Sequence, residues 1–401
     1  MKTAAVIAEF NPFHLGHAWL LEKAREAGAE RIIVLMSGDY VQRGAPALAD
    51  RHARAEMALL NGADLVIACP TRYAVSSAEH YARHTVGLLD RLHMADCLVF
   101  GSEEGEITRL QGCADVLLNE TPAFREALKT GLKNGLSFPA ARARALPEYR
   151  ALLSHPNNIL AVEYLKALRL AKSEMVPVTF ARQGRGYHDP DVSGSDASAT
   201  GIRKLISGQE AGVPSAVREA AGESVYRILL KEAENGGFLE ADDYSVLLAS
   251  KLFRISAGSE LTVYPDISED LALRIFRMRN QFSSFTSFAE CCAAKSVPAA
   301  RVMRALLHIA LDMKKEERYA DEGFIHVLGF RRDAAPMLKV TEKRADLPLI
   351  TNPPAYRDRL SGAAAALFEE ELYVSNLYNA VRSAKSGAPF RNEITKPLVI
   401  L

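Results

Sequence analysis

Two histidines stand close together near the N-terminus, in the sequence His14-Leu15-Gly16-His17. They follow an apolar run that reads as a strand, and they open a segment whose apolar residues have helical spacing. The first turn of a helix presents unpaired N–H groups and a positive dipole end, which suit phosphate oxygens. Both histidines can donate to one phosphate chain, and Gly16 lets a flat base approach the backbone closely. The pattern therefore indicates a phosphate site for a nucleotide, with ATP as the expected ligand.

The same histidine pair has two other interpretations, since a short HxGH motif also occurs by chance and two histidines could hold a metal ion. No third ligand at helical spacing lies nearby, so zinc is disfavoured and we assign no metal ligand. A second motif is Ser198-Ala199-Thr200-Gly201-Ile202-Arg203. Hydroxyls at a helix start with an arginine one turn later suit a leaving pyrophosphate. Taken alone, this motif could equally be an N-cap serine near an exposed arginine.

Apolar runs alternate with amphipathic stretches over the first two hundred residues. The expected strands are Ala4–Ala8, Arg31–Met36, Asp64–Ala68, Cys97–Phe100 and Val176–Ala181, and the expected helices cover 17–27, 50–60, 76–92 and a segment from about Ser198. Near-continuous apolar strands separated by helices are typical of a parallel sheet covered on both faces. We therefore predict an α/β fold with a doubly wound parallel sheet.

Loops of unusual composition follow four of these strands. They are rich in glycine, charge or histidine, and they comprise Asn11–His17, Ser37–Pro46, Gly101–Gly105 and Arg182–Asp189. Ligands on open α/β sheets bind outside the carboxyl ends of the strands. We therefore expect the four loops to meet in one crevice.

The pattern changes beyond about residue 210. Helical segments dominate, at 213–234, 242–254, 268–281, 297–315 and 361–383, while the best strand candidates are Ile325–Leu328 and Leu338–Val340. We predict two domains: a nucleotide-binding domain over 1–210, with a helical insertion at about 106–172, and a mostly helical domain over 211–401.

The composition limits the class of protein. The formal net charge is +0, which argues against a uniformly basic nucleic-acid binder but permits a local basic face. The five cysteines include no CxxC pair, which fits reduced thiols rather than a disulfide framework or zinc ribbon. No run of about 18 uncharged apolar residues occurs, so we expect no membrane span and a cytoplasmic protein.

The motifs together resemble a known family. HxGH after the first strand is similar to the signature of the HUP-like nucleotidylyltransferase superfamily, whose members often carry S-x-T-x-I-R later in the domain. The segments EFNPFHLGH, SGDYVQRGAPA, GADLVIACP, FGSEEG and HPNNILAVEYLKAL resemble the tRNA(Met) cytidine acetate ligase family, well over about 1–210 and more weakly beyond. The resemblance implies activation of acetate by ATP to acetyl-adenylate, then acetylation of N4 of the wobble cytidine of elongator tRNA(Met), with no role for DNA or membrane.

The resemblance also implies site residues. It places catalytic roles on His14, His17 and Arg203, and the phosphates would carry Mg²⁺. It places ATP contacts on Ile7, Ala8, Glu9, Phe10, Asn11, Pro12, Phe13, His14, Gly16, His17, Leu20, Gly101, Asn158, Arg182 and Ser198. Candidates for the acetate and phosphate side are Glu9, Asn11, Ser37, Gln42 and Arg43.

Two other functions stay open at this point, a small-metabolite adenylyltransferase and a non-catalytic RNA-binding relative. The chain departs from the family pattern at 294–300, where a basic aromatic segment is replaced by AKSVPAA, and at Cys69, where an acidic residue is expected. Candidate RNA contacts in the second half are Arg274, Arg277, Arg279, Lys314, Lys315, Phe330, Arg331, Arg332, Lys343 and Arg344.

Overall fold

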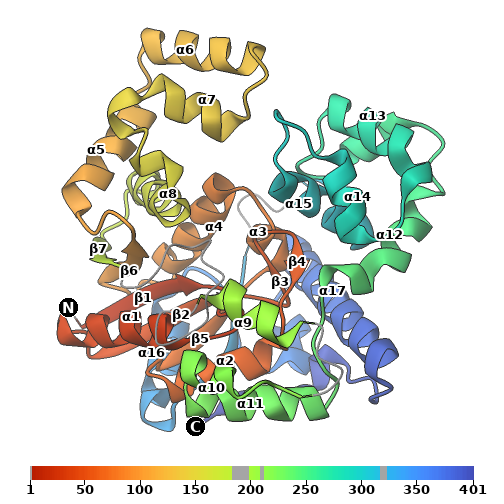
Figure 1. Cartoon of the computed structure of the whole chain (residues 1–401). Helices are drawn as coiled ribbons and strands as arrows, with labels where there is room; N and C mark the ends of the chain where they lie inside the picture. The colour runs from red at the N-terminus through yellow and green to blue at the C-terminus, as the bar shows by residue number, and fades with distance from the viewer. Residues whose placement is uncertain (1, 183–197, 208–211, 317–322) are drawn as a thin grey trace.

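One mixed sheet organises the protein. The computed structural model describes residues 2–182, 198–207, 212–316 and 323–401. The sheet has the strand order β10-β8-β5-β2-β1-β6-β7, with β9 paired to β8. Figure 1 labels β5, β2, β1, β6 and β7 of this sheet. Its strands are β1 (Thr3–Ala8), β2 (Arg31–Ser37), β5 (Leu65–Cys69), β6 (Cys97–Ser102), β7 (Val176–Ala181), β8 (Ile325–Phe330), β9 (Leu349–Ile350) and β10 (Val399–Ile400). The five strands expected in the first half are therefore confirmed.

Helices cover both faces of this sheet. Successive side chains of a strand point to opposite faces, so a strand that is apolar throughout needs cover on both sides. On β2, Ile32 and Val34 pack into one apolar cluster, while Ile33 and Leu35 pack into another. The Ile32 side is covered by α1 (Leu15–Glu26), α2 (Arg51–Leu60), α9 (Ala199–Ile206), α10 (Ala216–Ala221) and α11 (Glu223–Glu234). The other side holds α3 (Thr71–Ala74), α4 (Ala78–Asp90), α5 (Ile107–Leu118), α6 (Pro122–Lys133), α8 (Pro156–Ala171), α16 (Ala335–Arg344) and α17 (Gly362–Ser386), with α7 (Phe138–Ala145) beside α6. The doubly wound α/β prediction is confirmed.

Two features of the second half differ from the expected arrangement. Strand β8 runs antiparallel beside β5, which makes the sheet mixed rather than purely parallel. The expected strand Leu338–Val340 is wrong, because these residues lie inside α16, where Met337 and Thr341 point inward four residues apart. The second half is helical over most of its length. It also completes the sheet, because β8, β9 and β10 all lie beyond residue 211. The predicted division into two domains stays a prediction.

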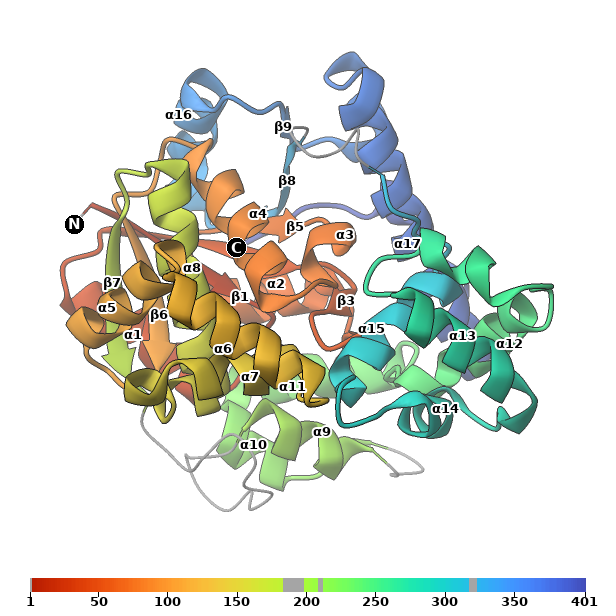
Figure 2. The same ribbon diagram turned by 90° about the horizontal axis from the view of Figure 1, so that it is seen from above.

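A separate apolar core lies in the helical unit formed by α12 (Ser245–Leu252), α13 (Glu269–Met278), α14 (Phe285–Cys292) and α15 (Ala299–Ala310). Figure 2 shows these helices gathered beside α17. Tyr40, which lies in the short hairpin of β3 (Tyr40–Val41) and β4 (Ala45–Pro46), belongs to this core. Its hydroxyl lies 3.0 Å from that of Tyr244 and donates to the carbonyl of Val374 at 3.1 Å. The loop after β2 is thus anchored to the helical unit.

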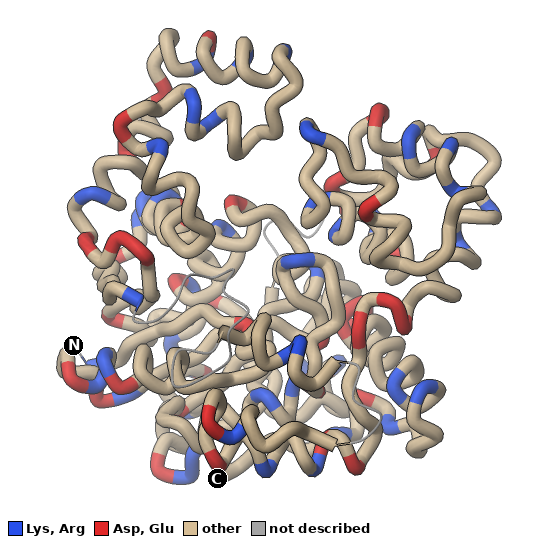
Figure 3. Tube along the Cα trace, in the orientation of Figure 1, with Lys and Arg blue, Asp and Glu red and all other residues tan. Residues whose placement is uncertain are grey.

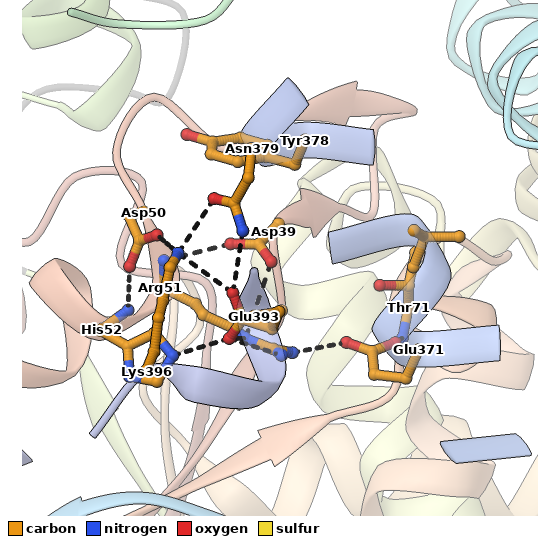
Figure 4. Close-up of polar contacts among 12 residues, drawn as sticks. Asp39, Asp50, Arg51, His52, Thr71, Glu371, Tyr378, Asn379, Glu393 and Lys396 are labelled. Carbon is orange, nitrogen blue, oxygen red and sulfur yellow. Dashed lines mark hydrogen bonds and ion pairs between the residues drawn. The ribbon is translucent and has the colours of Figure 1, made fainter. Parts of the chain in front are cut away.

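A buried ionic cluster joins the C-terminal segment to the first half (Figure 4). Arg51 is fully buried at the start of α2 and donates to Glu371 at 2.8 Å and to Glu393 at 2.9 Å. Asp39 lies 3.6 Å from the guanidinium, and Lys396 lies 3.0 Å from Glu393. Ion pairs between segments more than 300 residues apart therefore fix α17 and the chain end against the loop that follows β2.

Acidic and basic residues are interspersed along the described trace, as the neutral net charge suggests (Figure 3). Within the described ranges, no helix is both long enough and apolar enough to cross a membrane.

Candidate active site

A cavity of about 760 Å³ opens at the carboxyl ends of β1 and β6, beside the first turns of α1, α8 and α9. Ligand sites of small molecules commonly have volumes of about 300–1,000 Å³. Of the predicted site residues, its wall holds Ile7, Ala8, Glu9, Phe10, Asn11, His14, Gly16, His17, Leu20, Gly101, Arg182, Ser198 and Arg203. Pro12, Phe13 and Asn158 are buried behind the wall. Part of the fourth predicted loop, 183–189, lies outside the described residues.

The two histidines are held by the backbone of the α1 N-terminus. The Nδ1 atom of His14 accepts from the N–H of Gly16 at 3.0 Å, and the Nδ1 atom of His17 accepts from the N–H of His14 at 3.3 Å. Their ring centroids are 3.8 Å apart. Because each Nδ1 accepts a hydrogen bond, the proton of each neutral ring resides on Nε2. Both rings therefore offer an Nε2–H donor to a ligand.

Burial keeps both rings uncharged. It lowers the pKa of His14 to about 3, and the positive charges of Arg182 and Arg203 act in the same direction. Burial also lowers the pKa of His17 well below its usual value, aided by His14 and Arg182. The histidines therefore act as neutral donors near pH 7. The positive charge of the site comes from arginines that line the cavity, Arg43, Arg182 and Arg203.

Helix α9 brings its arginine to the loop that precedes α1. Ser198 caps α9 by accepting from the N–H of Gly201 at 3.1 Å. Arg203, one turn later, donates to the carbonyl of Asn11 at 2.6 Å and to the Thr200 hydroxyl at 3.0 Å. The two motifs, far apart in sequence, thus form one wall of the cavity.

The loop after β6 is locked to the start of α8. Glu103 accepts from the Asn157 side chain at 2.6 Å and from the Asn158 N–H at 2.8 Å. Asn158 Oδ1 in turn accepts from the N–H of Glu104 at 2.9 Å. Asn157, which lines the cavity, accepts from Arg182 at 3.4 Å. Asn158 therefore supports the wall from behind, and its neighbour Asn157 is the residue on the surface of the cavity.

Some residues of the loop after β2 line the cavity, and others are buried in the protein interior. Gln42 and Arg43 line the cavity, whereas Ser37 is fully buried and does not. Gly44, with φ +79°, lies against α15, and a Cβ there would fall 2.3 Å from the backbone nitrogen of Arg304. A side chain at this position is excluded twice, by the left-handed backbone and by the helix. The helical unit therefore packs against the loop that carries Gln42 and Arg43 to the cavity.

Several cavity residues carried no signal in the sequence. Tyr81 and Tyr164 lie within helices whose apolar faces look like ordinary core, and 239–241 come from the second half of the chain. Glu103 could have been found, since it lies in the predicted loop Gly101–Gly105. Among the described residues, no group of three or more His, Cys, Asp or Glu could hold a metal ion.

Gly16→Ala is expected to weaken ATP binding without unfolding the protein. The backbone of Gly16 is not left-handed, but a Cβ would lie 2.9 Å from Cε1 of His14 and would push this ring from its place. Overpacking costs about 1–3 kcal/mol, so we expect the KM for ATP to rise about 10-fold to 100-fold. Gly87→Ala is the matched control, since nothing lies within 4 Å of a Cβ at this helical position. An unchanged KM for ATP in Gly16→Ala would contradict the expected contact between ATP and the His14 ring beside Gly16.

Comparisons with known proteins show the family of the chain. A family model described as HIGH Nucleotidyl Transferase matches residues 1–391. A protein of Caldanaerobacter subterraneus subsp. tengcongensis named tRNA(Met) cytidine acetate ligase is 35% identical over 388 residues, covering 94% of this chain and 95% of the relative. A Thermoanaerobacter sp. protein of the same name is 33% identical over 412 residues, covering 99% and 100%.

Solved structures give the same result. The crystal structure of Thermotoga maritima TmcAL in its apo form I has a TM-score of 0.91 at 30% identity. The same protein bound with alpha-thio ATP has a TM-score of 0.89 at 30% identity. Each comparison covers 100% of both chains.

Proposed function

Because the chain belongs to the tRNA(Met) cytidine acetate ligase family, we propose that it activates acetate with ATP and acetylates N4 of the wobble cytidine of elongator tRNA(Met). One observation carries the ATP half of this proposal. Two neutral histidines and Arg203 converge on one cavity from the N-terminal turns of α1 and α9. We assign the phosphate-binding and catalytic roles to His14, His17 and Arg203.

In the first step, the acetate carboxylate attacks the α-phosphorus of ATP, and the bond to the bridging oxygen of the pyrophosphate breaks. The reaction needs alignment and charge neutralisation rather than covalent help from the protein. The Nε2–H groups of His14 and His17 donate to phosphate oxygens, and Arg203 and Arg182 supply positive charge. Mg²⁺ on the phosphates would neutralise further charge. The cavity lacks a set of three or more ligating side chains in the described chain, which fits an ion held mainly by ATP.

We further propose that 1–210 is the nucleotide domain, with its helical insertion at 106–172, and that the helical part of 211–401 contacts the tRNA. Of the predicted RNA contacts, Arg277 is exposed on α13. Arg279 stacks on Phe276 at 3.8 Å, a pair suited to packing on an unstacked base. Arg274 has a structural contact instead, a donation to the Cys292 carbonyl at 3.4 Å. Phe330 packs against the core, which argues against RNA stacking.

The proposal is tested by ATP–pyrophosphate exchange with and without acetate, followed by incubation with bulk bacterial tRNA and detection of N4-acetylcytidine. We expect exchange that depends on acetate and acetylcytidine that depends on ATP. Exchange that needs a phosphorylated metabolite instead would indicate a small-molecule adenylyltransferase. No exchange with any acid would indicate a non-catalytic RNA-binding relative.

A further inference from the structure

Glu9 is a cavity carboxylate that is poorly suited to the phosphates of ATP. Glu9 directly follows β1 and lines the cavity, a few residues before the histidine-bearing turn. A carboxylate carries negative charge and no donor, so it repels phosphate and acetate oxygens. The same group attracts a ligand that presents N–H. This end of the cavity therefore favours a partner with an amino group.

The Glu9 side chain is fixed by the neighbouring loop. Its Oε1 atom accepts from the backbone N–H of Gln42 at 2.8 Å, while its backbone carbonyl accepts from Arg54 at 2.7 Å. Since Oε1 is already paired within the described chain, Oε2 is the oxygen left for a ligand. The carboxylate is thus oriented before any substrate arrives, as a preorganised site requires.

Gln42 adds a donor beside this acceptor. Its side-chain Nε2 is buried, yet it has no hydrogen-bond partner among the described residues, and the residue lines the cavity. A buried amide N–H without a partner costs about 1–3 kcal/mol, which a ligand acceptor would recover. Glu9 therefore presents an acceptor and Gln42 a donor to the same cavity, and the hydrogen bond from the Gln42 backbone joins the two residues.

Aromatic rings form a wall of the same cavity. Tyr81, Phe100 and Tyr164 all line it and are each no more than 5% exposed. The ring centroids of Phe100 and Tyr164 are 5.7 Å apart. Burial raises the pKa of Tyr164, and the charge of Glu9 raises it further. Enzymes that act on an extruded base hold it against such apolar and aromatic surfaces.

From this geometry we infer that Glu9 and Gln42 read the Watson–Crick edge of the acceptor cytosine. The N4 amino group donates to Glu9 Oε2, and the N3 atom accepts from Gln42 Nε2. Uracil reverses both groups, with an oxygen at position 4 and N–H at position 3. Its O4 would therefore face the acceptor Glu9 Oε2, and its N3–H would face the donor Gln42 Nε2. The inference rests on the proposed function and names the residues that select its acceptor.

The same contact gives Glu9 a chemical role in the transfer step. The N4 nitrogen attacks the carbonyl carbon of acetyl-adenylate, so that an N–C bond forms. The bond between that carbon and the phosphate oxygen breaks, and AMP leaves. The nitrogen loses one proton, which passes to the Glu9 carboxylate and then to water. A positioned general base contributes about 10²–10⁴ in rate.

The experiment supplies synthetic acetyl-adenylate, so that the transfer step is observed without the adenylation step. The acceptor is an unmodified elongator tRNA(Met) transcript, and the single-turnover rate of acetylcytidine formation is measured with enzyme in excess. We expect Glu9→Gln to lower this rate by about 10²–10⁴-fold, with Glu9→Asp intermediate. Gln42→Leu should lower the transfer rate about 10-fold to 100-fold. This variant should also bind the transcript and a transcript with uridine in place of the acceptor cytidine equally well. Glu22→Gln, exposed on α1, is the matched control.

A transfer rate in Glu9→Gln that equals the wild-type rate would overturn the inference. So would a Glu9→Gln defect confined to pyrophosphate exchange and relieved by excess Mg²⁺, which would make Glu9 a metal ligand. The Gln42→Leu variant tests base reading even if Glu9→Gln fails to fold. If the wild-type enzyme shows no acetate-dependent exchange and no transfer, then the proposed function itself fails, which is a different result.

Discussion

Replacing His17 by alanine is expected to lower acetate-dependent ATP–pyrophosphate exchange by about 10²–10³-fold, the usual cost of removing one preorganised donor. The neutral His17 ring uses Nδ1 to hold the His14 backbone, so its Nε2–H is directed to the ligand. Alanine removes this donor and also half of the capping arrangement at the start of α1. Loss of a cap costs about 1 kcal/mol, so the protein should remain folded.

The measurement is the initial rate of exchange at saturating acetate, with circular dichroism and thermal unfolding to confirm the fold. His80→Ala serves as the control, because His80 is exposed at the start of α4 and does not line the cavity. Near-normal exchange in a folded His17→Ala protein would refute the assignment of the phosphate site.

Replacing Arg51 by methionine should strongly destabilise the folded protein. Arg51 is 0% exposed and lies among Asp39, Glu371 and Glu393 (Figure 4). Methionine fills similar space but leaves these carboxylates without their buried cation. Breaking a buried ion pair from one side typically costs about 3–5 kcal/mol. We expect a loss of this size in the free energy of unfolding at pH 7, measured with guanidinium.

The pH dependence of this loss distinguishes a charge effect from a packing effect. Burial acts to raise the pKa of Glu393, but Arg51, His52 and Lys396 hold it well below its usual value. A carboxylate with a lowered pKa stabilises the fold above its unfolded pKa, and this stabilisation is lost as the pH falls through the folded pKa. In Arg51→Met the carboxylates protonate at higher pH, so the difference from wild type should shrink as the pH falls from 7 towards 4.

Arg125→Met is the matched control, since its ion pair with Glu120 is largely exposed. Exposed pairs contribute less than about 1 kcal/mol, with little change over this pH range. A difference between Arg51→Met and wild type that stays constant with pH would show that lost packing, not unpaired charge, causes the instability. The cluster also bears on function, because Asp39 lies only a few residues before Gln42 on the loop that borders the cavity.

The helical unit and the active site are joined at Gly44. Its backbone touches α15, and the same loop carries Gln42 to the cavity. The loop that is proposed to read the acceptor base is therefore in contact with the helical unit.

The sequence by itself determined the α/β class, the first five strands and the histidine-bearing turn at the start of α1. These features depend on residues close together in the chain: apolar runs, helix starts and the pair His14 and His17. Local patterns also placed most of the predicted site residues at strand ends, where parallel strands bring loops together.

Only the tertiary structure decided which distant segments meet. In the folded protein β8 lies antiparallel beside β5, and Leu338–Val340 are helical. Asn158 lies behind the cavity wall, whereas Tyr81, Tyr164 and 239–241 line the cavity. None of these contacts has a local signal, because each is fixed by packing between residues far apart in sequence. The same holds for the neutral state of His14 and His17, which follows from burial by the whole fold rather than from the motif that revealed them.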